Sequence, residues 1–261
     1  MRDFLKDVRG SSLFKILQPE KIKTFGVTVA MCTHRGVSIS VIKRIKMLES
    51  CPRPKITFRL LEGDALIERS RARVATEFLL NTNDDILIFL DDDILIAPKD
   101  VQKLALVCKE KDLDILGAAY VTKDEDNPAF TFRTLANEED IPFGTNGGLN
   151  EIRMQATGCI AIQRRVFQEM VERGDAVLCN NQNLQFYPFF TPMTRMIDRH
   201  PVYLSEDWAF CERARELGFK VWLDTTIKVG HIGPKVYDWD DLSREKKEKK
   251  NNFDYLVRIK E

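Results

Sequence analysis

The chain has 261 residues, and 40 lysine and arginine side chains balance 40 aspartate and glutamate side chains. This length is sufficient for one large α/β domain with its own buried core. The zero net charge argues against a general binder of nucleic acid or of anionic membranes.

The cysteines and apolar runs indicate neither export nor membrane insertion. The six cysteines are scattered without a CxxC pair, and several lie in apolar segments, which is typical of reduced thiols in a cytosolic protein. The amino-terminal MRDFLKDVRG lacks the apolar core of a signal peptide. No apolar run approaches the roughly 20 residues that cross a bilayer. We therefore expect a soluble, cytoplasmic protein.

Strand-like and helix-like segments alternate through the first half of the chain. Runs rich in Val, Ile and Leu predict strands, and amphipathic segments predict helices. The expected elements are a strand at 25–32, a helix at 38–49, a strand at 55–61, a helix at 65–80, a strand at 86–90, a helix at 100–111 and a strand at 114–120. This alternation predicts a parallel sheet covered on both faces, with ligands bound beyond the carboxyl ends of its strands.

The second half is less regular. Residues 124–150 contain acids, prolines and glycines and predict a loop with a short hairpin, whereas residues 155–170 predict a strand that leads into a helix. The aromatic, proline-broken stretch 184–193 is predicted to form a pocket wall. Near the end, apolar residues at 253–257 predict a docked terminal helix, with a membrane-surface or partner helix as the alternative.

Three consecutive acids, Asp91, Asp92 and Asp93, follow the buried run 86–90. In an extended strand Asp91 and Asp93 would point the same way, about 6.6 Å apart. Their repulsion would cost about 2–3 kcal/mol at an effective dielectric constant near 20. A divalent cation would reverse this sign, and oxygen-rich sites suit Mg²⁺ or Mn²⁺, often completed by phosphate oxygens. The pattern therefore favours a metal–phosphate site over a solvated turn.

A second acidic pair, Glu206 and Asp207, lies in the first turn of a helix that is predicted to follow Ser205 and to stop at Gly218. Acids at this position complement the helix dipole, which is by itself a sufficient reason for them. However, Asp207 begins an apolar stripe with the spacing i, i+3, i+4, i+7. Its carboxylate is therefore predicted to face a pocket or the interior.

His231 and two arginines complete the candidate residues. His231 stands between two glycines, which allow close backbone approach, and imidazole can complete a Mn²⁺ shell. Arg69 and Arg71 lie near the start of the helix at 65–80, where a phosphate or nucleotide could bind. Arg69 and Arg73 also share a helix face with Glu77, so an exposed ladder of charges explains this cluster equally well.

Six segments, in order over residues 25–233, resemble nucleotide-sugar glycosyltransferases of the GT-A fold, in particular the small family-2-like enzymes of bacteria, phages and large viruses. They are GVTVAMCTHRG, LIERSRARVATEFL, DILIFLDDDILI, QATGCIAIQRRVF, SEDWAFCERARELGFKVWLD and GHIG. The resemblance implies a mostly parallel central sheet with flanking helices and a smaller acceptor-side β region. It also implies a nucleotide-sugar half at 25–123 and an acceptor half at 124–233. An N-terminal extension, 1–24, and a C-terminal helical extension, 234–261, would flank them.

The resemblance implies roles for individual residues on the donor side. Asp91 and Asp93 match the DxD motif that holds the metal, Mn²⁺ or Mg²⁺, and the donor diphosphate, and His231 matches a histidine that completes the metal shell. Asp92 would lie nearer the ribose. The other implied nucleotide-sugar contacts are Thr33, Arg35, Glu62 or Asp64, Arg69 and Arg71. The first-strand motif CTHRG lacks the usual Pro-Thr-x-Asn-Arg form, so the base stays open.

On the acceptor side, Gly158 matches the strand beneath the acceptor and the donor sugar. Glu206 and Asp207 match an acidic pair that serves the acceptor and, in inverting members, supplies the base. We therefore expect transfer of a sugar from a UDP- or GDP-type donor to a glycan, lipid-linked or protein acceptor. The reaction is inverting if Asp207 is the base and could be retaining if Asp207 only orients the acceptor. Peripheral membrane contact stays open.

Three other functions share parts of this pattern. A non-catalytic nucleotide- or sugar-binding module would keep the donor site without the chemistry. Aspartate-nucleophile phosphatases also place DxD after an apolar strand, but that strand normally opens their fold, whereas two β–α units precede it here. Nucleotidyltransferases need a Gly-rich loop after the first strand, and MCTHRG is not one.

Overall fold

The computed structural model describes residues 25–34, 36–37, 39–50, 54–126, 128–135, 141–180, 184–197 and 199–242. The N-terminal extension, Arg35 and the terminal helix expected near residues 253–257 lie outside this part of the chain. Among the described residues, none of the helices combines the length and the apolar character needed to cross a membrane.

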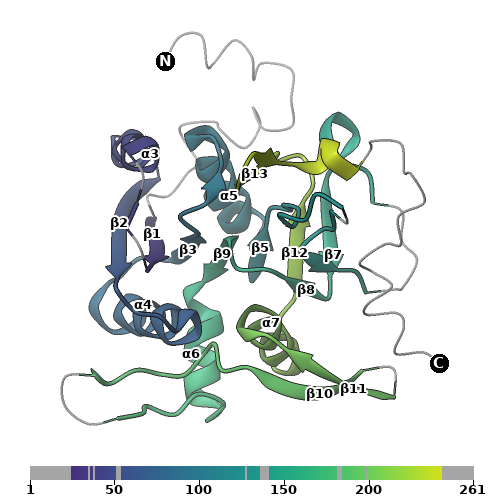
Figure 1. Ribbon diagram of the computed structural model, residues 1–261. Helices are drawn as coiled ribbons and strands as arrows, with labels where there is room; N and C mark the ends of the chain where they lie inside the picture. The colour runs from purple at the N-terminus through teal and green to yellow at the C-terminus, as the bar shows by residue number, and fades with distance from the viewer. Residues whose placement is uncertain are drawn as a thin grey trace.

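Seven strands of the described chain form the central sheet (Figure 1). In spatial order they are β2 (Lys55–Glu62), β1 (Gly26–Thr33), β3 (Ile86–Leu90), β9 (Cys159–Gln163), β5 (Ile115–Gly117), β12 (Val221–Asp224) and β7 (Leu149–Ile152). Strands β9 and β7 run against the others. The predicted α/β fold with a mostly parallel sheet is therefore confirmed, and the reversed β9 was not anticipated.

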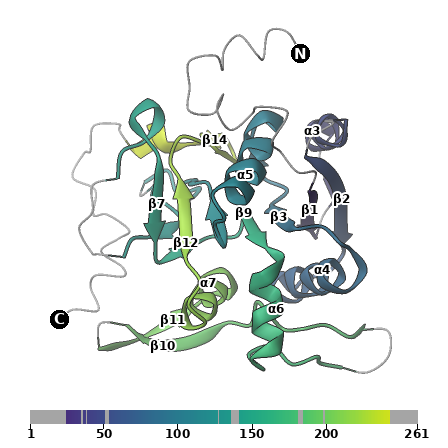
Figure 2. The ribbon, with the colours of Figure 1, turned by 180° about the vertical axis from the view of Figure 1, so that it is seen from behind.

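Helices cover both faces of this sheet (Figures 1 and 2). On one face lie α3 (Ile39–Glu49) and α5 (Pro98–Glu110), and on the other lie α4 (Ile67–Asn81), α6 (Arg164–Glu172) and α7 (Glu206–Glu216). Strand β3 shows why the sheet needs both layers: Leu87 and Phe89 pack on the α4 side, and Ile86 and Ile88 on the α3 side. All four are buried, as expected for a central strand.

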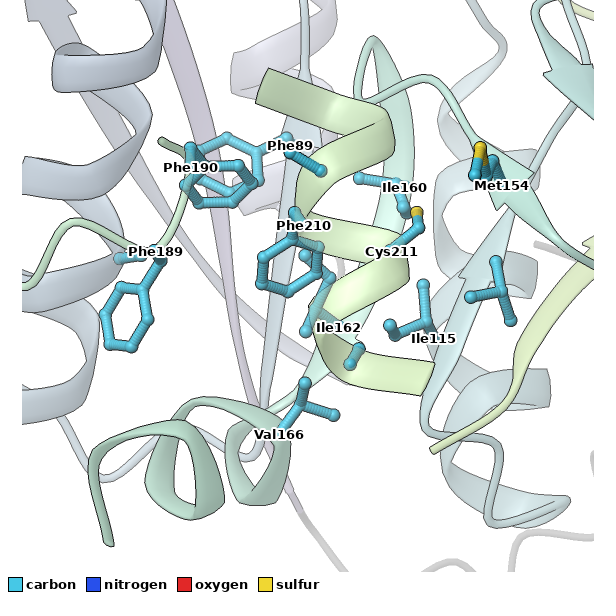
Figure 3. Packing of buried hydrophobic residues seen from close by; sticks show 14 of the residues in the cluster. Phe89, Ile115, Met154, Ile160, Ile162, Val166, Phe189, Phe190, Phe210 and Cys211 are labelled. Carbon is cyan, nitrogen blue, oxygen red and sulfur yellow. The ribbon is translucent and has the colours of Figure 1, made fainter. Parts of the chain in front are cut away.

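The core beneath α7 combines aliphatic side chains with several phenylalanine rings (Figure 3). Phe190 stacks on Phe210 with ring centroids 4.6 Å apart and meets Phe89 edge-on at 5.5 Å. Phe189 is also fully buried. The prediction that residues 184–193 form a pocket wall is therefore wrong for these two phenylalanines, because their rings fill the space between α7 and the sheet.

The remaining β elements of the described chain form small separate sheets beside the central one. They are β6 (Phe132–Arg133) paired with β8 (Met154–Gln155), the hairpin of β10 (Met193–Ile197) and β11 (His200–Leu204), the sheet β14 (Val236–Tyr237), β13 (Gly230–Ile232) and β4 (Ile94–Leu95), and 3-10 turns at Gly144–Asn146 and Trp239–Leu242. Because β14 pairs with β13, the expected domain boundary after residue 233 cuts through this last sheet.

Candidate active site

Three parallel strands end at one edge of the sheet, and the acid triplet lies at that edge. Thr33 at the end of β1 pairs in register with Glu62 at the end of β2, and β3 ends at Leu90, directly before Asp91. Glu62 is exposed at this edge, whereas Thr33 is buried. The carboxyl edge of the sheet therefore gathers residues from three segments, as the sequence predicted.

The triplet itself is not an extended continuation of β3. The amide of Ile94 donates to the carbonyl of Asp91 at 3.1 Å, which closes a turn over residues 91–94 before β4 begins. The expectation that Asp91 and Asp93 point the same way along a strand is therefore wrong. Because the chain reverses here, each aspartate faces a different partner.

Asp92 faces the end of β1. The hydroxyl of Thr33 donates to Asp92 Oδ2 at 2.5 Å, and it also lies 3.3 Å from the carbonyl oxygen of Gly36. This contact joins the first and third strands through side chains, so two of the predicted nucleotide-binding residues lie together.

Asp91 and Glu206 share one guanidinium. Arg71 Nη2 lies 2.9 Å from both carboxylate oxygens of Asp91, and Arg71 Nη1 lies 2.5 Å from Glu206 Oε1. The Arg71 side chain is only 5% exposed, so this is a buried bridge between α4, the acid triplet and α7. Burial disfavours its charge, but the Asp91 and Glu206 carboxylates outweigh burial and hold the pKa of Arg71 above its usual value.

Asp93 meets a lysine and a histidine. Lys123 Nζ contacts Asp93 Oδ2, and His231 Nε2 lies 3.4 Å from the same oxygen. Burial works against the charge of Asp93, yet hydrogen bonding to His231 and Lys123 lowers its pKa to about 2. Asp93 is therefore a carboxylate throughout the physiological range.

The small sheet brings His231 to this position. β13 pairs with β4, and the amide of Ile232 donates to the carbonyl of Asp93 at 2.7 Å. Gly230 is required here, because a Cβ at this residue would lie 2.7 Å from Val236 Cγ1 on the neighbouring strand. The sequence-based prediction that glycines beside His231 allow close backbone approach is confirmed.

The backbone also orients the imidazole. His231 Nδ1 lies 2.8 Å from the carbonyl oxygen of Val121. With its proton on Nδ1 donated to this carbonyl, the ring turns Nε2 toward Asp93. A protonated Nε2 hydrogen-bonds the carboxylate, and an unprotonated Nε2 is a ligand for a cation placed between the two. A carbonyl bound to the far nitrogen is the arrangement that orients histidine ligands in metal sites.

Gly158 lies beneath the triplet for steric reasons. Its amide donates to the buried Tyr120 hydroxyl at 3.1 Å, and its carbonyl accepts from the Asp91 amide at 3.0 Å. A Cβ on Gly158 would lie 2.4 Å from the Tyr120 oxygen and 3.1 Å from Asp91 Oδ2. Gly158 therefore belongs to the support of Asp91, and whether it also lies beneath a sugar stays a prediction.

The two acids at the start of α7 have different surroundings. Burial, followed by the neighbouring Asp207 carboxylate, raises the pKa of Glu206 above its usual value. Asp207 Oδ1 accepts from the Ser205 hydroxyl and, at 2.8 Å, from the Trp208 amide. Ser205 is the residue before the helix, as predicted, but its side chain bonds Asp207 instead of a helix amide. The apolar stripe below Asp207 is buried, as predicted.

Asp64 and Arg69 pair with each other. Asp64 accepts from Arg69 at 2.6 and 2.8 Å and from the Leu66 amide at 3.1 Å, directly before α4. The hydrogen bond from Arg69 lowers the pKa of Asp64 to about 2. Both border a surface cavity of about 330 Å³ that Glu62, Asn180 and Phe186 also line. Glu62, Asp64 and Arg69, which the resemblance implied as nucleotide-sugar contacts, therefore lie around one cavity beyond the end of β2.

The predicted metal ligands are only partly assembled. Within the described chain, no three His, Cys, Asp or Glu side chains gather closely enough to hold a metal ion. Asp93 and His231 form a pair, and Asp91 faces Arg71 instead of completing the set. One carboxylate and one oriented imidazole still fit a Mg²⁺- or Mn²⁺-type cation whose remaining ligands are water and substrate phosphate.

Three features escaped the sequence analysis: the bridging role of Arg71, the contact of Lys123 with Asp93, and the hydroxyl of Tyr120 beneath Gly158. Lys123 and Tyr120 lie at or just beyond the end of the predicted fourth strand. Because ligands bind beyond strand ends, the end of this fourth strand is the sequence signal that points to both residues.

No protein-family model and no curated protein sequence matches this chain. Among solved structures, the crystal structure of A197 from STIV is similar, with a TM-score of 0.54 and 15% identity over 79% of this chain and 85% of that one. GalNAc-T7, solved with UDP, GalNAc and Mn²⁺, gives a TM-score of 0.47 and 13% identity over 82% of this chain and 45% of that one. The first likeness, with the sheet order, supports a GT-A-like α/β fold. Identity this low shows the fold alone.

Proposed function

We propose that the chain is a metal-dependent glycosyltransferase that moves a sugar from a nucleoside-diphosphate sugar to an acceptor hydroxyl. One observation carries the proposal: an aspartate and a backbone-oriented histidine, Asp93 and His231, converge at the carboxyl edge of the sheet. This edge is where open α/β sheets bind ligands. Arg71 also joins this edge to α7, because its guanidinium pairs with Asp91 and with Glu206.

On the donor side, Asp93 and His231 would hold the cation, while the Asp91 carboxylate is engaged by Arg71. The cation would neutralise negative charge on the departing diphosphate. Asp92, fixed by the Thr33 hydroxyl, is our candidate for the ribose contact. Glu62, Asp64 and Arg69 border the cavity beyond β2 and are our candidates for the base.

On the acceptor side, Asp207 is our candidate base. Within the described chain its Oδ2 has no hydrogen-bond partner, whereas Ser205 and Trp208 fix Oδ1. Oδ2 would take the hydroxyl proton while the acceptor oxygen bonds to the anomeric carbon. The bond from that carbon to the diphosphate oxygen breaks, and its electron pair leaves with the nucleoside diphosphate. Attack opposite the leaving group inverts the anomeric centre.

The first test is a thermal-shift panel of UDP, GDP, CMP and dTDP and their sugars, each with and without Mn²⁺. A ligand that binds only the folded state raises the melting temperature by mass action. We expect one nucleoside diphosphate to stabilise the fold only with metal, and Asp93→Ala to lose the effect. If no nucleotide shifts the melting temperature under any metal condition, the proposed donor site is wrong.

The contact between Asp91 and Arg71 favours a second candidate, a nucleotide- or sugar-binding module without catalysis. Both Asp91 oxygens face a buried guanidinium, which leaves one fewer carboxylate for a cation. The two functions differ in one readout. A transferase releases nucleoside diphosphate from its donor sugar over time, whereas a binding module returns the donor intact.

A further inference from the structure

A lysine that the proposed mechanism does not use lies at the centre of the site. Lys123 Nζ contacts Asp93 Oδ2, which is the oxygen that His231 Nε2 faces at 3.4 Å. An ammonium group and an imidazole nitrogen therefore converge on one carboxylate oxygen. A cation held between His231 Nε2 and this oxygen must share the oxygen with the lysine or displace it.

The base of Lys123 is fixed, and its tip can move. The preceding residue, Thr122, is held by two bonds to Ala129: its amide donates to the Ala129 carbonyl at 2.8 Å, and its hydroxyl accepts from the Ala129 amide at 3.1 Å. A Cβ on Gly233 would lie 3.2 Å from Lys123 Cδ, so the aliphatic stem of Lys123 packs against this glycine. The side chain is nevertheless 34% exposed, and four rotatable bonds let the ammonium leave Asp93 while the stem stays in place.

Electrostatics decides what happens when a divalent cation binds. A doubly charged ion between Asp93 and His231 would sit within a few ångströms of the Lys123 ammonium, where like charges repel strongly in a half-buried setting. The carboxylate gains more from the divalent ion than from a single ammonium. Lys123 would then move to the nearest uncompensated anion, and a diphosphate drawn in by the cation is such an anion.

We propose that Lys123 and a divalent cation exchange at Asp93, and that the displaced ammonium binds a diphosphate oxygen of the donor. This inference rests on the proposed function. It adds to the cation a second positive charge, the Lys123 ammonium, that would contact the departing diphosphate. Lys123 would oppose metal binding when no nucleotide is present and favour nucleotide binding once the metal is in place.

The proposal predicts two effects of opposite sign for Lys123→Met. Without nucleotide, Mn²⁺ should bind about tenfold more tightly, because the competing ammonium is gone. At saturating Mn²⁺, the nucleoside diphosphate found in the thermal-shift panel should bind about tenfold more weakly, because one charge-assisted contact is lost. General damage to the fold would weaken both.

The experiment measures free Mn²⁺ by electron paramagnetic resonance and nucleotide binding by calorimetry, on the full chain. Lys123→Arg keeps the charge and should stay close to wild type in nucleotide affinity. Lys235→Met removes a nearby lysine that pairs with Asp241 at 3.0 Å, and it should leave both affinities unchanged.

The outcomes separate this inference from the function on which it rests. If the wild type binds Mn²⁺ and nucleotide but Lys123→Met leaves the Mn²⁺ affinity unchanged or weaker, the exchange is wrong and the donor site stands. If Lys123→Met binds Mn²⁺ more tightly but binds the nucleotide as well as the wild type does, the proposed contact between Lys123 and the diphosphate is wrong. If the wild type binds no nucleotide with any metal, both fail.

Discussion

The acid triplet and the acid pair on α7 are held in place by different kinds of contact. Asp91, Asp92 and Asp93 each meet a residue far away in the sequence, at separations of 20, 59 and 30 residues. Asp207 is held by its immediate neighbours, Ser205 and Trp208. The geometry of the triplet thus depends on the whole fold, whereas that of Asp207 depends on the start of one helix.

This difference predicts how the two regions respond to substitution. A change at Asp207 should alter chemistry with little effect on folding or donor binding, since its partners are local. A change in the partners of the triplet should reduce stability and donor binding together. Arg71 is where the regions meet, because it bonds Asp91 and also Glu206, 135 residues away from it in the chain.

The largest effect is expected for Asp207→Asn, which removes the proposed base from the acid pair on α7. Removing a general base typically lowers the rate 10²- to 10⁴-fold, so we expect transfer to fall about a thousandfold. The amide keeps the shape of the side chain, so the nucleotide-induced thermal shift should persist. The measurement is nucleoside diphosphate release in the presence of acceptor, alongside the thermal shift.

The matched control is Glu216→Gln at the far end of α7, where the exposed side chain pairs with Arg195. It should retain wild-type transfer. Turnover by Asp207→Asn similar to that of the wild type would remove Asp207 as the base and shift attention to Glu206.

The next largest effect is expected for Arg71→Met, which removes the link between the regions. It leaves the Asp91 and Glu206 carboxylates without their shared cation, and breaking a buried ion pair costs about 3–5 kcal/mol. We expect about 3 kcal/mol of lost unfolding free energy, at the lower end because Asp91 is 28% exposed. Urea denaturation measures the loss.

Arg71→Lys sharpens this test, because lysine keeps the charge but cannot span two carboxylates with one planar fork. We expect it to lose less stability than Arg71→Met and still bind Mn²⁺ and nucleotide more weakly than wild type. Adding Glu206→Gln should be less harmful in the Arg71→Met background than in wild type. Strictly additive losses would contradict the shared bridge.

The sequence predicted those parts of the molecule that local pattern determines. The strand at 86–90 has the bounds of β3, and the helix expected at 38–49 is found at Ile39–Glu49. Helix periodicity and apolar runs need only neighbouring residues. The reversed direction of β9 and the short pairs such as β6 with β8 depend on contacts between distant segments, which no local pattern contains.

The same division applies to the site. The resemblance implied that Thr33, the acid triplet and His231 belong to one donor site, and the structure places Thr33 against Asp92 and His231 against Asp93. The turn at Asp91 and the guanidinium of Arg71 between two carboxylates were not predictable, because both depend on how α4 and β4 pack. Which residues touch substrate stays a prediction.

A smaller effect is expected for Gly158→Ala, which crowds the residues that hold Asp91 in place. The new methyl group would lie 2.4 Å from the buried Tyr120 oxygen, and overpacking of this kind costs about 1–3 kcal/mol. Nucleotide binding should weaken together with the stability of the fold, because the same methyl group would also lie 3.1 Å from Asp91 Oδ2. Gly148→Ala is the control, since a Cβ there meets no atom within 4 Å. Equal stability of the two variants would contradict the packing argument.

The smallest effect is expected for Asp64→Asn. It tests whether the distinction between local and distant partners also applies to an acid outside the triplet and the α7 pair. Asp64 is held locally, by Arg69 and by the Leu66 amide. Its pKa is lowered to about 2, chiefly by the hydrogen bond from Arg69, so the ionised form stabilises the fold. That stabilisation is complete above the ordinary aspartate pKa near 4 and is lost as the pH falls through 2.

The Asp64 side chain is only 5% exposed, but its partner Arg69 is 47% exposed, so solvent screens the contact. We therefore expect Asp64→Asn to cost only about 1 kcal/mol at pH 7. The difference from wild type should shrink steadily between pH 4 and pH 2, which urea denaturation at several pH values would measure. A difference that stays constant down to pH 2 would mean that shape, and not charge, explains the loss. Nucleotide affinity separates structure from function here: if Asp64 contacts the base, the variant loses affinity at pH 7 beyond what its small change in stability explains.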